Sequence, residues 1–314
     1  MAQQQVAIIV VGSTMIDMMT YAERVPAAGE TLVGERFAQG FGGKGANQAV
    51  MASRLGAAVA MVNCVGDDVF GDMTLENLTR EGIDVTSVSR VAGVSSGVAP
   101  IWVEANGANR IIVVPGANNH VSPEQARTAL EAAADVHLVL GQFEIPQAAT
   151  ASAFAAGRRR GAVTVLNPAP AAELSPELLE VTDWLIPNEV EFGYLARACG
   201  VDAVRLDDEA MTAVAARTTG RLVVTLGADG AAVCADGQVT RVLAPQVQAV
   251  DSTGAGDAFV GTFAYGLARG MSPADAADLG CRCAAVSVTR HGTQTSFPSP
   301  DEIAQLRQDL GQDG

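Results

Sequence analysis

Basic residues are scarce in this chain of 314 residues. It has 35 acidic but only 20 basic side chains, a formal net charge of -15, and Lys44 is its sole lysine. The only basic cluster is Arg158 to Arg160. Proteins that bind nucleic acids need a basic surface to neutralise phosphates, so this balance argues against a nucleic-acid partner. The acidic excess is more consistent with solubility.

Long apolar runs and paired cysteines are also missing. No stretch reaches the roughly twenty apolar residues of a membrane span, and the N-terminus lacks the basic flank of a signal peptide. The five cysteines are an odd number scattered through apolar segments, which predicts buried thiols in a reducing compartment. Cys281 and Cys283 lack the further ligands of a zinc site. We therefore expect a cytoplasmic protein without a membrane partner.

Short β-branched runs alternate with alanine-rich segments of helical length along most of the chain. Continuous apolar strands are typical of parallel sheets, so this alternation predicts a doubly wound α/β fold, with a mostly parallel sheet flanked by helices. The expected strands are 6–12, 59–66, 136–142, 162–167, 183–188 and 221–227, and the expected helices are 47–55, 123–134, 147–160, 189–198 and 209–218.

Two regions break this rhythm because strand follows strand in them. They are 30–40 and the pair 95–105 and 109–116, which Asn106 and Gly107 join as a hairpin turn. These strands predict a small β-sheet lid, formed by roughly residues 18–40 and 93–115, over one edge of the main sheet. No repeat or low-complexity linker divides the chain, so we expect one domain over residues 1–314.

The sole lysine lies in the glycine-rich stretch "GFGGKGANQAV" at residues 40–50. Gly40, Gly42 and Gly45 fit the dinucleotide fingerprint GxGxxG, which requires a core strand directly before it. Here the preceding segment belongs to the expected lid, so a nicotinamide-binding site is a weak alternative. A Walker A loop is excluded because Ala38 replaces its first glycine. A lysine can enter a cramped anionic site that a guanidinium cannot.

A second glycine-rich stretch, "DSTGAGDAF" at residues 251–259, leads into an apolar helical pattern. Glycine N–H groups that turn toward one point, together with a helix N-terminus, form an anion site. We expect the helix to begin near Asp257. This aspartate is either an ordinary N-cap or a base that accepts a proton from an attacking hydroxyl.

A third stretch, "LIPNEVEF" at residues 185–192, runs from a strand into a helix. Asn188 and Glu191 are three residues apart at the helix start, where they could orient Mg²⁺ and water around phosphates. The same spacing fits a capping box equally well. The sequence alone leaves both interpretations open.

Taken together, these stretches resemble the ribokinase or PfkB family of carbohydrate kinases. "GGKGANQA" (42–49), "NPAPA" (167–171), "PNEVE" (187–191) and "DSTGAGDAF" (251–259) occur in the family's order, so the resemblance spans nearly the whole chain. It implies an α/β core with a β-lid, a sugar held under the lid, and ATP with Mg²⁺ and K⁺ as cofactors. An exposed lid edge could pair with a second copy, which favours a homodimer.

The resemblance also implies roles for individual residues. Asp257 would be the base, and the N–H groups of Gly254, Ala255 and Gly256 would stabilise the transferring phosphoryl group. The sugar would be held by Asp17, Gly42, Gly43, Asn47 and Glu144, with Lys44 assisting where sugar and phosphate meet. Asn188, Thr225 and Gly227 would contact the nucleotide, Glu191 would organise Mg²⁺, and Cys281 would lie near the adenine. The monovalent cation would lie beside Asp251, Thr253, Ser287, Arg290, Gly292 and Ser296.

The substrate is indicated by the motif after the first strand. Ribokinases typically carry G-S-x-N-x-D there, whereas this chain has "GSTMID", with Met15 in place of the asparagine. This resembles the deoxyribokinase branch, whose substrate is 2-deoxy-D-ribose and whose product is its 5-phosphate. Alternatively, Met15 only fills a gap and the substrate is D-ribose. A non-catalytic sugar-binding protein is a further alternative, but it would not need the GAGD motif.

Overall fold

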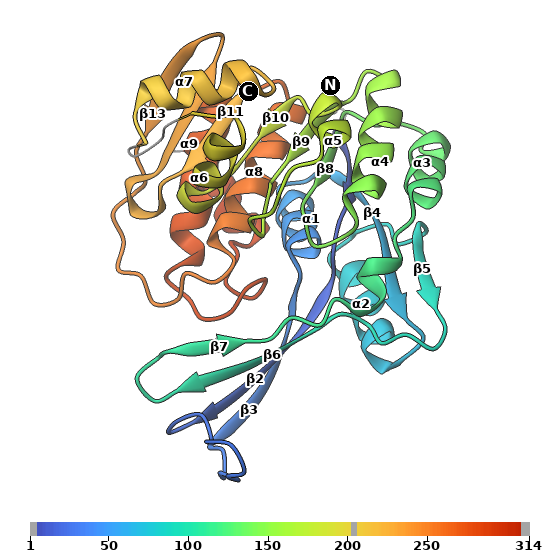
Figure 1. Cartoon of the computed structure of the whole chain (residues 1–314), viewed down its shortest axis with the longest axis vertical. Helices are drawn as coiled ribbons and strands as arrows, with labels where there is room; N and C mark the ends of the chain where they lie inside the picture. Colours follow the sequence, from blue (N-terminus) through green and yellow to red (C-terminus); the bar gives the residue numbers. More distant parts are fainter. Residues whose placement is uncertain (1–4, 202–205, 309–314) are drawn as a thin grey trace.

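The computed structural model describes residues 5–201 and 206–308, and Figure 1 shows a broad α/β body from which a small sheet projects. In these residues a nine-stranded sheet has the order β13-β12-β11-β10-β9-β8-β1-β4-β5. Its strands are β1 (Ala7–Val11), β4 (Ala58–Gly66), β5 (Val88–Val91), β8 (Leu138–Gly141), β9 (Val163–Leu166), β10 (Trp184–Leu185), β11 (Leu222–Thr225), β12 (Ala231–Ala235) and β13 (Gln238–Val242). From β5 to β11 neighbouring strands are parallel, and β12 and β13 are antiparallel, which confirms the predicted mostly parallel sheet.

Helices cover both faces of this sheet, as expected for strands that are apolar on both sides. One layer contains α1 (Lys44–Arg54), α8 (Ala255–Ala268), α9 (Pro273–Ser287) and α10 (Pro300–Gln308). The other contains α3 (Pro123–Ala132), α4 (Gln147–Arg159), α5 (Pro176–Glu180), α6 (Glu189–Ala198) and α7 (Asp208–Arg217). Helix α2 (Val69–Arg80) follows β4 and contributes Leu78 to the first layer. All five predicted helices are therefore present.

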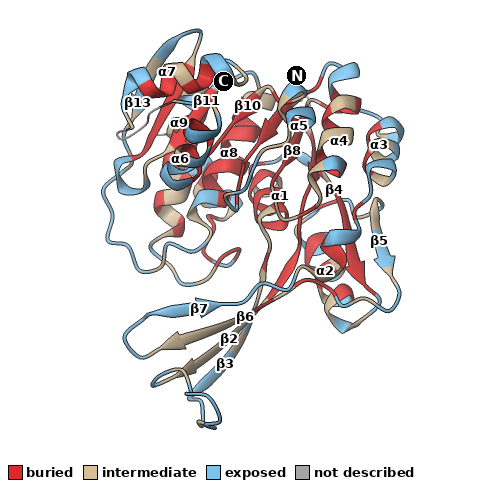
Figure 2. Ribbon diagram, in the orientation of Figure 1, coloured by how far each residue is buried: buried red, intermediate tan, exposed pale blue. Residues whose placement is uncertain are grey.

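The central strand shows how one sequence serves two hydrophobic cores. Successive side chains of a strand point to opposite faces, so Ile8 and Val10 join the core under α1 and α8. Ile9 then joins the core under α3 and α4. All three side chains are at most 4% exposed. Figure 2 shows the inner strands of the main sheet buried between the helical layers, whereas the edge strands β5 and β13 are half-buried or exposed.

Several helices start at residues that the sequence marks clearly. Ser122, Ser175 and Ser272 each precede a proline, and each side chain accepts a hydrogen bond from the N–H group three residues later. These caps satisfy N–H groups that would otherwise lack an intrahelical partner. The starts of α3, α5 and α9 are thus fixed locally.

The small sheet has the order β3-β2-β6-β7 and consists of β2 (Met15–Ala22), β3 (Arg36–Gly42), β6 (Val98–Glu104) and β7 (Asn109–Ile111). Strand β2 pairs antiparallel with β3 and parallel with β6. The hairpin turn is confirmed at Gly107, which has a φ of 84° and donates its N–H to the Glu104 carbonyl at 2.8 Å. The sheet is mostly half-buried or exposed (Figure 2).

Some boundaries differ from the sequence-based expectation. The strand expected over 30–40 begins only at Arg36. The one expected over 109–116 ends at Ile111, because its next partner is Pro100, which has no N–H to donate, and pairing resumes only as a bridge between Val98 and Val114. The predicted lid began at about residue 18, whereas strand β2 of the small sheet begins at Met15. The ends of the predicted 1–314 domain, 1–4 and 309–314, lie outside the described residues, as do 202–205.

Candidate active site

The candidate site lies where the small sheet meets the main sheet. Parallel strands end at the same edge, and ligands of open α/β sheets bind beyond those carboxyl ends. Glu144 follows β8, Asn188 follows β10 and Gly227 follows β11. The starts of α1 and α8 reach the same edge and carry Lys44 and Asp257 (Figure 1). Segments distant in the sequence thus meet at one place.

Two glycines allow the chain to pass closely from β3 into α1. Gly43 has a φ of 87°, and a Cβ atom there would lie 2.7 Å from the Thr14 Cα. A Cβ atom on Gly42 would lie 2.5 Å from Oδ2 of Asp17. A side chain at either position would therefore separate α1 from the start of β2. Gly42 thus lies beside Asp17, and Gly43 lies beside Thr14; that these glycines and Asp17 hold a sugar stays a prediction.

The dinucleotide interpretation of this stretch is wrong. Strand β3, which precedes α1, belongs to the small sheet and pairs only with β2 in the described residues. A dinucleotide fingerprint instead requires a strand of the main sheet before its helix. The first helical residue is Lys44, so the glycines serve the junction between the two sheets.

Lys44 is surrounded by carboxylates. Burial disfavours its charged form, but the charges of Asp257, Glu144 and Glu191 outweigh burial and raise the pKa of Lys44. The backbone N–H of Lys44 donates to Oε2 of Glu144 at 2.9 Å, and the Ser13 hydroxyl donates to the same oxygen. The ammonium is therefore held charged at the centre of an acidic cluster. An arriving phosphate would meet a cation there.

Asp17 lies on the other side of this cluster, on β2. Burial, with the neighbouring charges of Glu144 and Asp257, raises the pKa of Asp17 from 3.8 to about 7. Its carboxylate points at Gly42, as the close approach above shows. The sequence predicted that Asp17, Glu144 and Asp257 face one site. Their carboxylates are near enough for the charges of Glu144 and Asp257 to raise the pKa of Asp17.

Asp257 is the third residue of α8, and it is 7% exposed. The helix begins two residues before the expected start, and its N-cap is Gly254 with a φ of 77°. The N-cap interpretation of Asp257 is therefore wrong, since glycine supplies the left-handed conformation that the cap requires. The Asp257 carboxylate accepts hydrogen bonds from the side-chain amides of Asn47 (2.8 Å) and Gln48 (3.0 Å).

The three residues expected to form an anion site at the start of α8 have different surroundings. A Cβ atom on Gly256 would meet nothing within 4 Å, so this residue faces open space. A Cβ atom on Gly254 would instead lie 2.6 Å from Cγ2 of Thr293. The N–H of Ala255 donates to the Ser252 carbonyl at 3.2 Å, so in this structure it is not aimed at a ligand.

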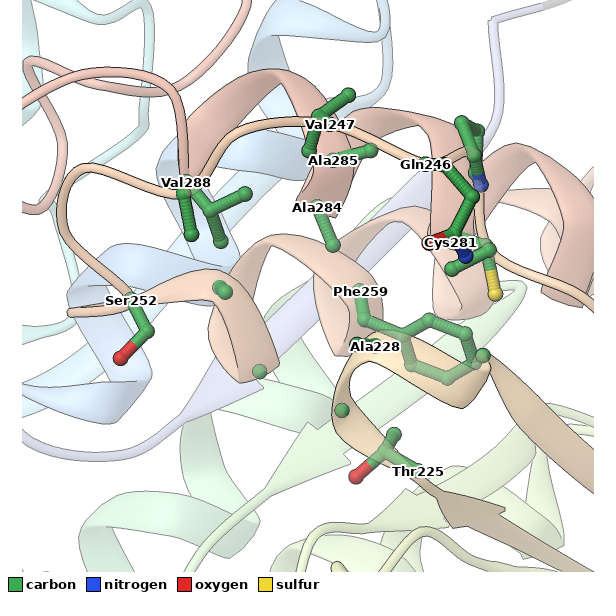
Figure 3. Close-up of a pocket in the computed structure, with 17 residues that line it drawn as sticks. Thr225, Ala228, Gln246, Val247, Ser252, Phe259, Cys281, Ala284, Ala285 and Val288 are labelled. Atoms are coloured by element: carbon green, nitrogen blue, oxygen red, sulfur yellow. The ribbon is translucent and has the colours of Figure 1, made fainter.

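Two cavities meet at Gly256. The larger, of about 370 Å³, is shown in Figure 3; apolar side chains such as Phe259, Ala284 and Val288 line most of it. Thr225, Gly227 and Cys281 also line it, and burial raises the pKa of the Cys281 thiol to about 12. The smaller cavity, of about 110 Å³, is polar; it shares Thr225 and Gly256 with the first and is also lined by Lys44, Asn167, Asn188, Glu191, Gly254 and Asp257.

Asn188 and Glu191 form a capping box at the start of α6. The Asn188 side chain accepts from the Glu191 N–H at 2.9 Å, and the Asn188 N–H donates to Oε2 of Glu191 at 2.8 Å. Burial raises the pKa of Glu191, and Asp257 adds to this, while the Asn188 N–H and Lys44 oppose it. The capping interpretation is therefore confirmed. Both residues nevertheless line the polar cavity, so capping also fixes their position there.

Of the six residues expected around a cation, the structure joins three by hydrogen bonds, Asp251, Thr253 and Gly292. Asp251 accepts hydrogen bonds from the Thr253 N–H (2.9 Å) and from the Gly292 N–H (3.0 Å). The hydroxyls of Ser287 and Ser296 donate to nearby carbonyls, and Arg290 forms an ion pair with Glu302. Among the residues described, no group of three His, Cys, Asp or Glu side chains is arranged to hold a metal ion.

Comparison with known proteins shows to which family the chain belongs. Residues 6–300 match the pfkB family of carbohydrate kinases. The chain belongs to this family. Deoxyribokinases of Salmonella typhi and Salmonella typhimurium are 40% identical over 297 residues, which cover 94% of this chain and 97% of theirs. The ribokinase of Schizosaccharomyces pombe is 36% identical over 305 residues, 94% of this chain and 96% of its own.

Solved structures of the family have the same fold. The ribokinase of Thermotoga maritima has a TM-score of 0.86 at 32% identity and covers 96% of this chain and 99% of its own. An Arabidopsis thaliana ribokinase complexed with ribose and ATP also has a TM-score of 0.86, at 28% identity and the same coverage. No helix within the described residues is long and apolar enough to cross a membrane.

Sequence reasoning assigned no role to several polar residues of this carbohydrate kinase site. Gln48, Gln142 and Gln294 are at most 5% exposed, and Asn167 is 7% exposed. Two of them stand inside stretches that were singled out, "GGKGANQA" and "NPAPA". Buried amides need hydrogen-bond partners, so an amide residue next to a motif could have been predicted to form hydrogen bonds within the site.

Proposed function

We propose that the protein is an ATP-dependent kinase that phosphorylates the 5-hydroxyl of 2-deoxy-D-ribose. The observation that carries the kinase assignment is the position of Asp257, which lines the polar cavity directly after Gly256, the residue at which this cavity meets the apolar one. The apolar cavity suits a nucleobase and the polar cavity suits phosphates. The carboxylate then lies where a hydroxyl would attack the terminal phosphate.

The chemistry follows from these positions. Asp257 accepts the proton of the sugar hydroxyl as its oxygen attacks the γ-phosphate in line, and ADP leaves. Lys44 and the N–H groups at the start of α8 stabilise the charge on the transferring group. Glu191 and Asn188 would organise Mg²⁺, which neutralises charge on the phosphates. One carboxylate fits an ion that takes most of its ligands from phosphates and water.

The loop of Asp251, Thr253, Ser287, Arg290, Gly292 and Ser296 would hold K⁺. Arg290 is turned to Glu302 and the serine hydroxyls donate to nearby carbonyls, so oxygens of the backbone and of Asp251 are the groups that fit. A cation here would stabilise the entry to α8 without touching the reacting atoms. Activity at fixed ionic strength should be higher in K⁺ than in tetramethylammonium, and equal rates would contradict this site.

The small sheet would close over the sugar as a lid, with residues 18–40 and 93–115 excluding water from the transfer. Both edge strands of this sheet expose an apolar side chain, since Phe37 of β3 is 59% exposed and Ile111 of β7, at the opposite edge, is 52% exposed. Such an edge would pair with the lid of a second copy, which gives a homodimer. Sedimentation of wild type against Ile111→Lys would detect this, and an unchanged monomer in both would refute it.

The choice of sugar rests on Met15, the first residue of β2. Met15 and Asp17 are two apart in the strand, so they share the face that looks toward the site. Met15 is 4% exposed, and its sulfur lies 3.8 Å from Nδ2 of Asn118. That amide already donates to the carbonyls of Thr14 (2.9 Å) and Pro115 (2.8 Å). A ribose 2-hydroxyl beside Met15 would find this amide already engaged.

The energetic consequence favours deoxyribose. Burying a hydroxyl without a good partner costs about 1 to 3 kcal/mol. This predicts a preference for 2-deoxy-D-ribose of roughly 5- to 150-fold in kcat/KM, since apolar pockets reject an added hydroxyl weakly. The deoxyribokinases at 40% identity support this assignment. The ribokinases at 35% to 37% identity support the alternative, D-ribose.

A coupled ADP-release assay over a panel of pentoses and hexoses tests the proposal. The wild-type enzyme should prefer 2-deoxy-D-ribose, and Met15→Asn should shift the ratio of the two kcat/KM values toward ribose. Met18→Asn is the matched control, because Met18 lies in the same strand on the opposite face. Preference of the wild type for ribose, or an equal shift in both variants, would leave ribokinase as the function.

A further inference from the structure

The Asp257 carboxylate is held from two sides by consecutive residues of α1. Nδ2 of Asn47 donates to its Oδ2 at 2.8 Å, and Nε2 of Gln48 donates to its Oδ1 at 3.0 Å. Gly261 permits this approach of α8 to α1, because a Cβ atom there would lie 2.6 Å from the Gln48 carbonyl oxygen. Both oxygens of the carboxylate are therefore fixed by amides.

Gln48 is itself fixed by a buried network of amides. Its Nε2 also donates to Oδ1 of Asn167 at 3.1 Å, and its Oε1 accepts from Nε2 of Gln142 at 2.7 Å. Asn167 in turn donates to the Ile186 carbonyl at 2.7 Å. Gln48 and Gln142 are both 0% exposed. The Gln48 amide cannot rotate without losing all three of its hydrogen bonds.

Gln48 has no direct access to either cavity. It lines neither the apolar nor the polar cavity, whereas Asp257 lines the polar one. Asn47 donates to Asp257 and is also expected, from the family resemblance, to bind a sugar hydroxyl. Gln48 contacts Asp257 but is enclosed by protein, so any effect on the reaction must pass through that carboxylate.

We propose that Gln48 is a positioning residue that sets the orientation of the Asp257 carboxylate for proton transfer. Each carboxylate oxygen accepts one amide N–H and keeps a second lone pair, so one of them can face the attacking hydroxyl. The hydroxyl proton passes to Asp257, and the amide protons stay in place because amides do not act as acids here. This role rests on the proposed function of Asp257 as the base.

The test is Gln48→Met, which keeps the length of the side chain but removes its amide. The kcat should fall by about 10- to 100-fold, because small misplacement of a reacting group is costly. The dissociation constant for the sugar, measured by calorimetry, should stay within about threefold. Thr262→Val is the matched control, since Thr262 is 0% exposed in α8 and its hydroxyl donates to the Ala258 carbonyl, away from Asp257. Its kcat should match that of wild type.

Gln48→Glu provides a second variant in case Gln48→Met folds poorly. In its ionised form the new carboxylate can still accept from Gln142 but cannot donate to Asp257. Burial beside Asp257 raises its pKa, so kcat is measured as the pH rises and should fall at least as far once this group ionises. A kcat within about threefold of wild type in a folded variant would overturn the proposal. The same conclusion follows if kcat, sugar affinity and melting temperature all fall together, as a structural role would require.

A double-mutant cycle separates the two proposals. In an Asp257→Asn background, Gln48→Met should cause no further loss in the residual rate, since its effect passes through the missing base. An equal loss in both backgrounds would overturn the positioning role alone. Full activity of Asp257→Asn itself would overturn the base assignment, and the positioning role with it. Whichever pentose the wild type prefers serves as substrate, so the cycle does not depend on the choice of sugar.

Discussion

The two cavities that share Gly256 are built from opposite kinds of side chain. The larger is lined mainly by Ala, Val and Phe residues of α8, α9 and the segment 244–249. The smaller gathers Lys44, Asp257 and Glu191 from three separate helices. The apolar cavity can select a ligand only by shape, whereas the polar one places charges at fixed points. Substitutions should therefore be far more costly in the polar cavity.

The largest effect is expected for Asp257→Asn. The amide keeps the shape of the side chain but cannot accept the hydroxyl proton, so kcat should fall by about 10² to 10⁴. Sugar and ATP affinities should stay within about threefold, since neither cavity changes size. Steady-state kinetics with calorimetry measure both. Asp278→Asn, in an ion pair with Arg282 on α9, is the control. Retention of more than about a tenth of the activity would contradict the assignment.

The next effect contrasts two glycines of one motif. Gly256→Ala places a methyl group in open space at the junction of the cavities, so the melting temperature should hold while kcat/KM for ATP falls about 10- to 100-fold. Gly254→Ala forces a φ of 77° and a clash with Thr293, which should destabilise the protein by about 1 to 3 kcal/mol. Thermal melts and kinetics distinguish them. Equal melting temperatures would show that Gly254 is not needed for the cap.

The sequence predicted six of the nine strands of the main sheet, because their signals are local, and it missed β5, β12 and β13. Strand β1 is apolar at every position, and the cap at Ser122 stands directly before the proline that opens an expected helix. The start of α8 was misplaced by two residues because Gly254, rather than a side chain, caps the helix. Strand β2 was missed as a lid strand from Met15 because "MIDMMTY" has no regular alternation of polar and apolar residues.

The motifs predicted the charged residues of the site, but they did not predict the buried amides that support those residues. Lys44, Asp257 and Glu191 are charged and stand in glycine-rich or capping patterns, so each carries its own signal. Gln142 and Gln294 have no such pattern, and their roles depend on contacts with residues about one hundred or more positions away. The chain of amides from Asn77 through Gln294 to Asn47 exists only after folding.

A smaller effect concerns the stability of the polar region, through Asp17. Its pKa is about 7 when folded because of burial, Glu144 and Asp257, against 3.8 ordinarily, so between these values the folded protein binds a proton that the unfolded chain has lost. Stability therefore falls as the pH rises from about 4 to 7. Asp17→Asn avoids the buried charge and should be more stable than wild type by about 1 to 3 kcal/mol at pH 8.

Melting temperatures across this pH range measure the difference. The margin of Asp17→Asn over wild type should widen between pH 5 and pH 7 and then become constant. Glu23→Gln, at an exposed position just beyond the same strand, controls for the loss of one negative charge. The nearby Lys44 remains in all three proteins. A margin that narrows as the pH rises would show that the charge of Asp17 is favoured by folding.

The smallest effect is expected in the apolar cavity, for Cys281→Ser. The Cys281 thiol stays protonated because burial raises its pKa to about 12, so it is a weak donor and contributes mainly its shape. Serine is similar in size, and the KM for ATP should change by no more than about threefold, since one neutral hydrogen bond has a small net value. Cys283→Ser is the control two residues away: Cys283 is 0% exposed and does not line the cavity, so it should lower the melting temperature without changing this KM. A change above about tenfold for Cys281→Ser would mean that the base is recognised by a specific hydrogen bond, and the contrast between the two cavities would no longer hold.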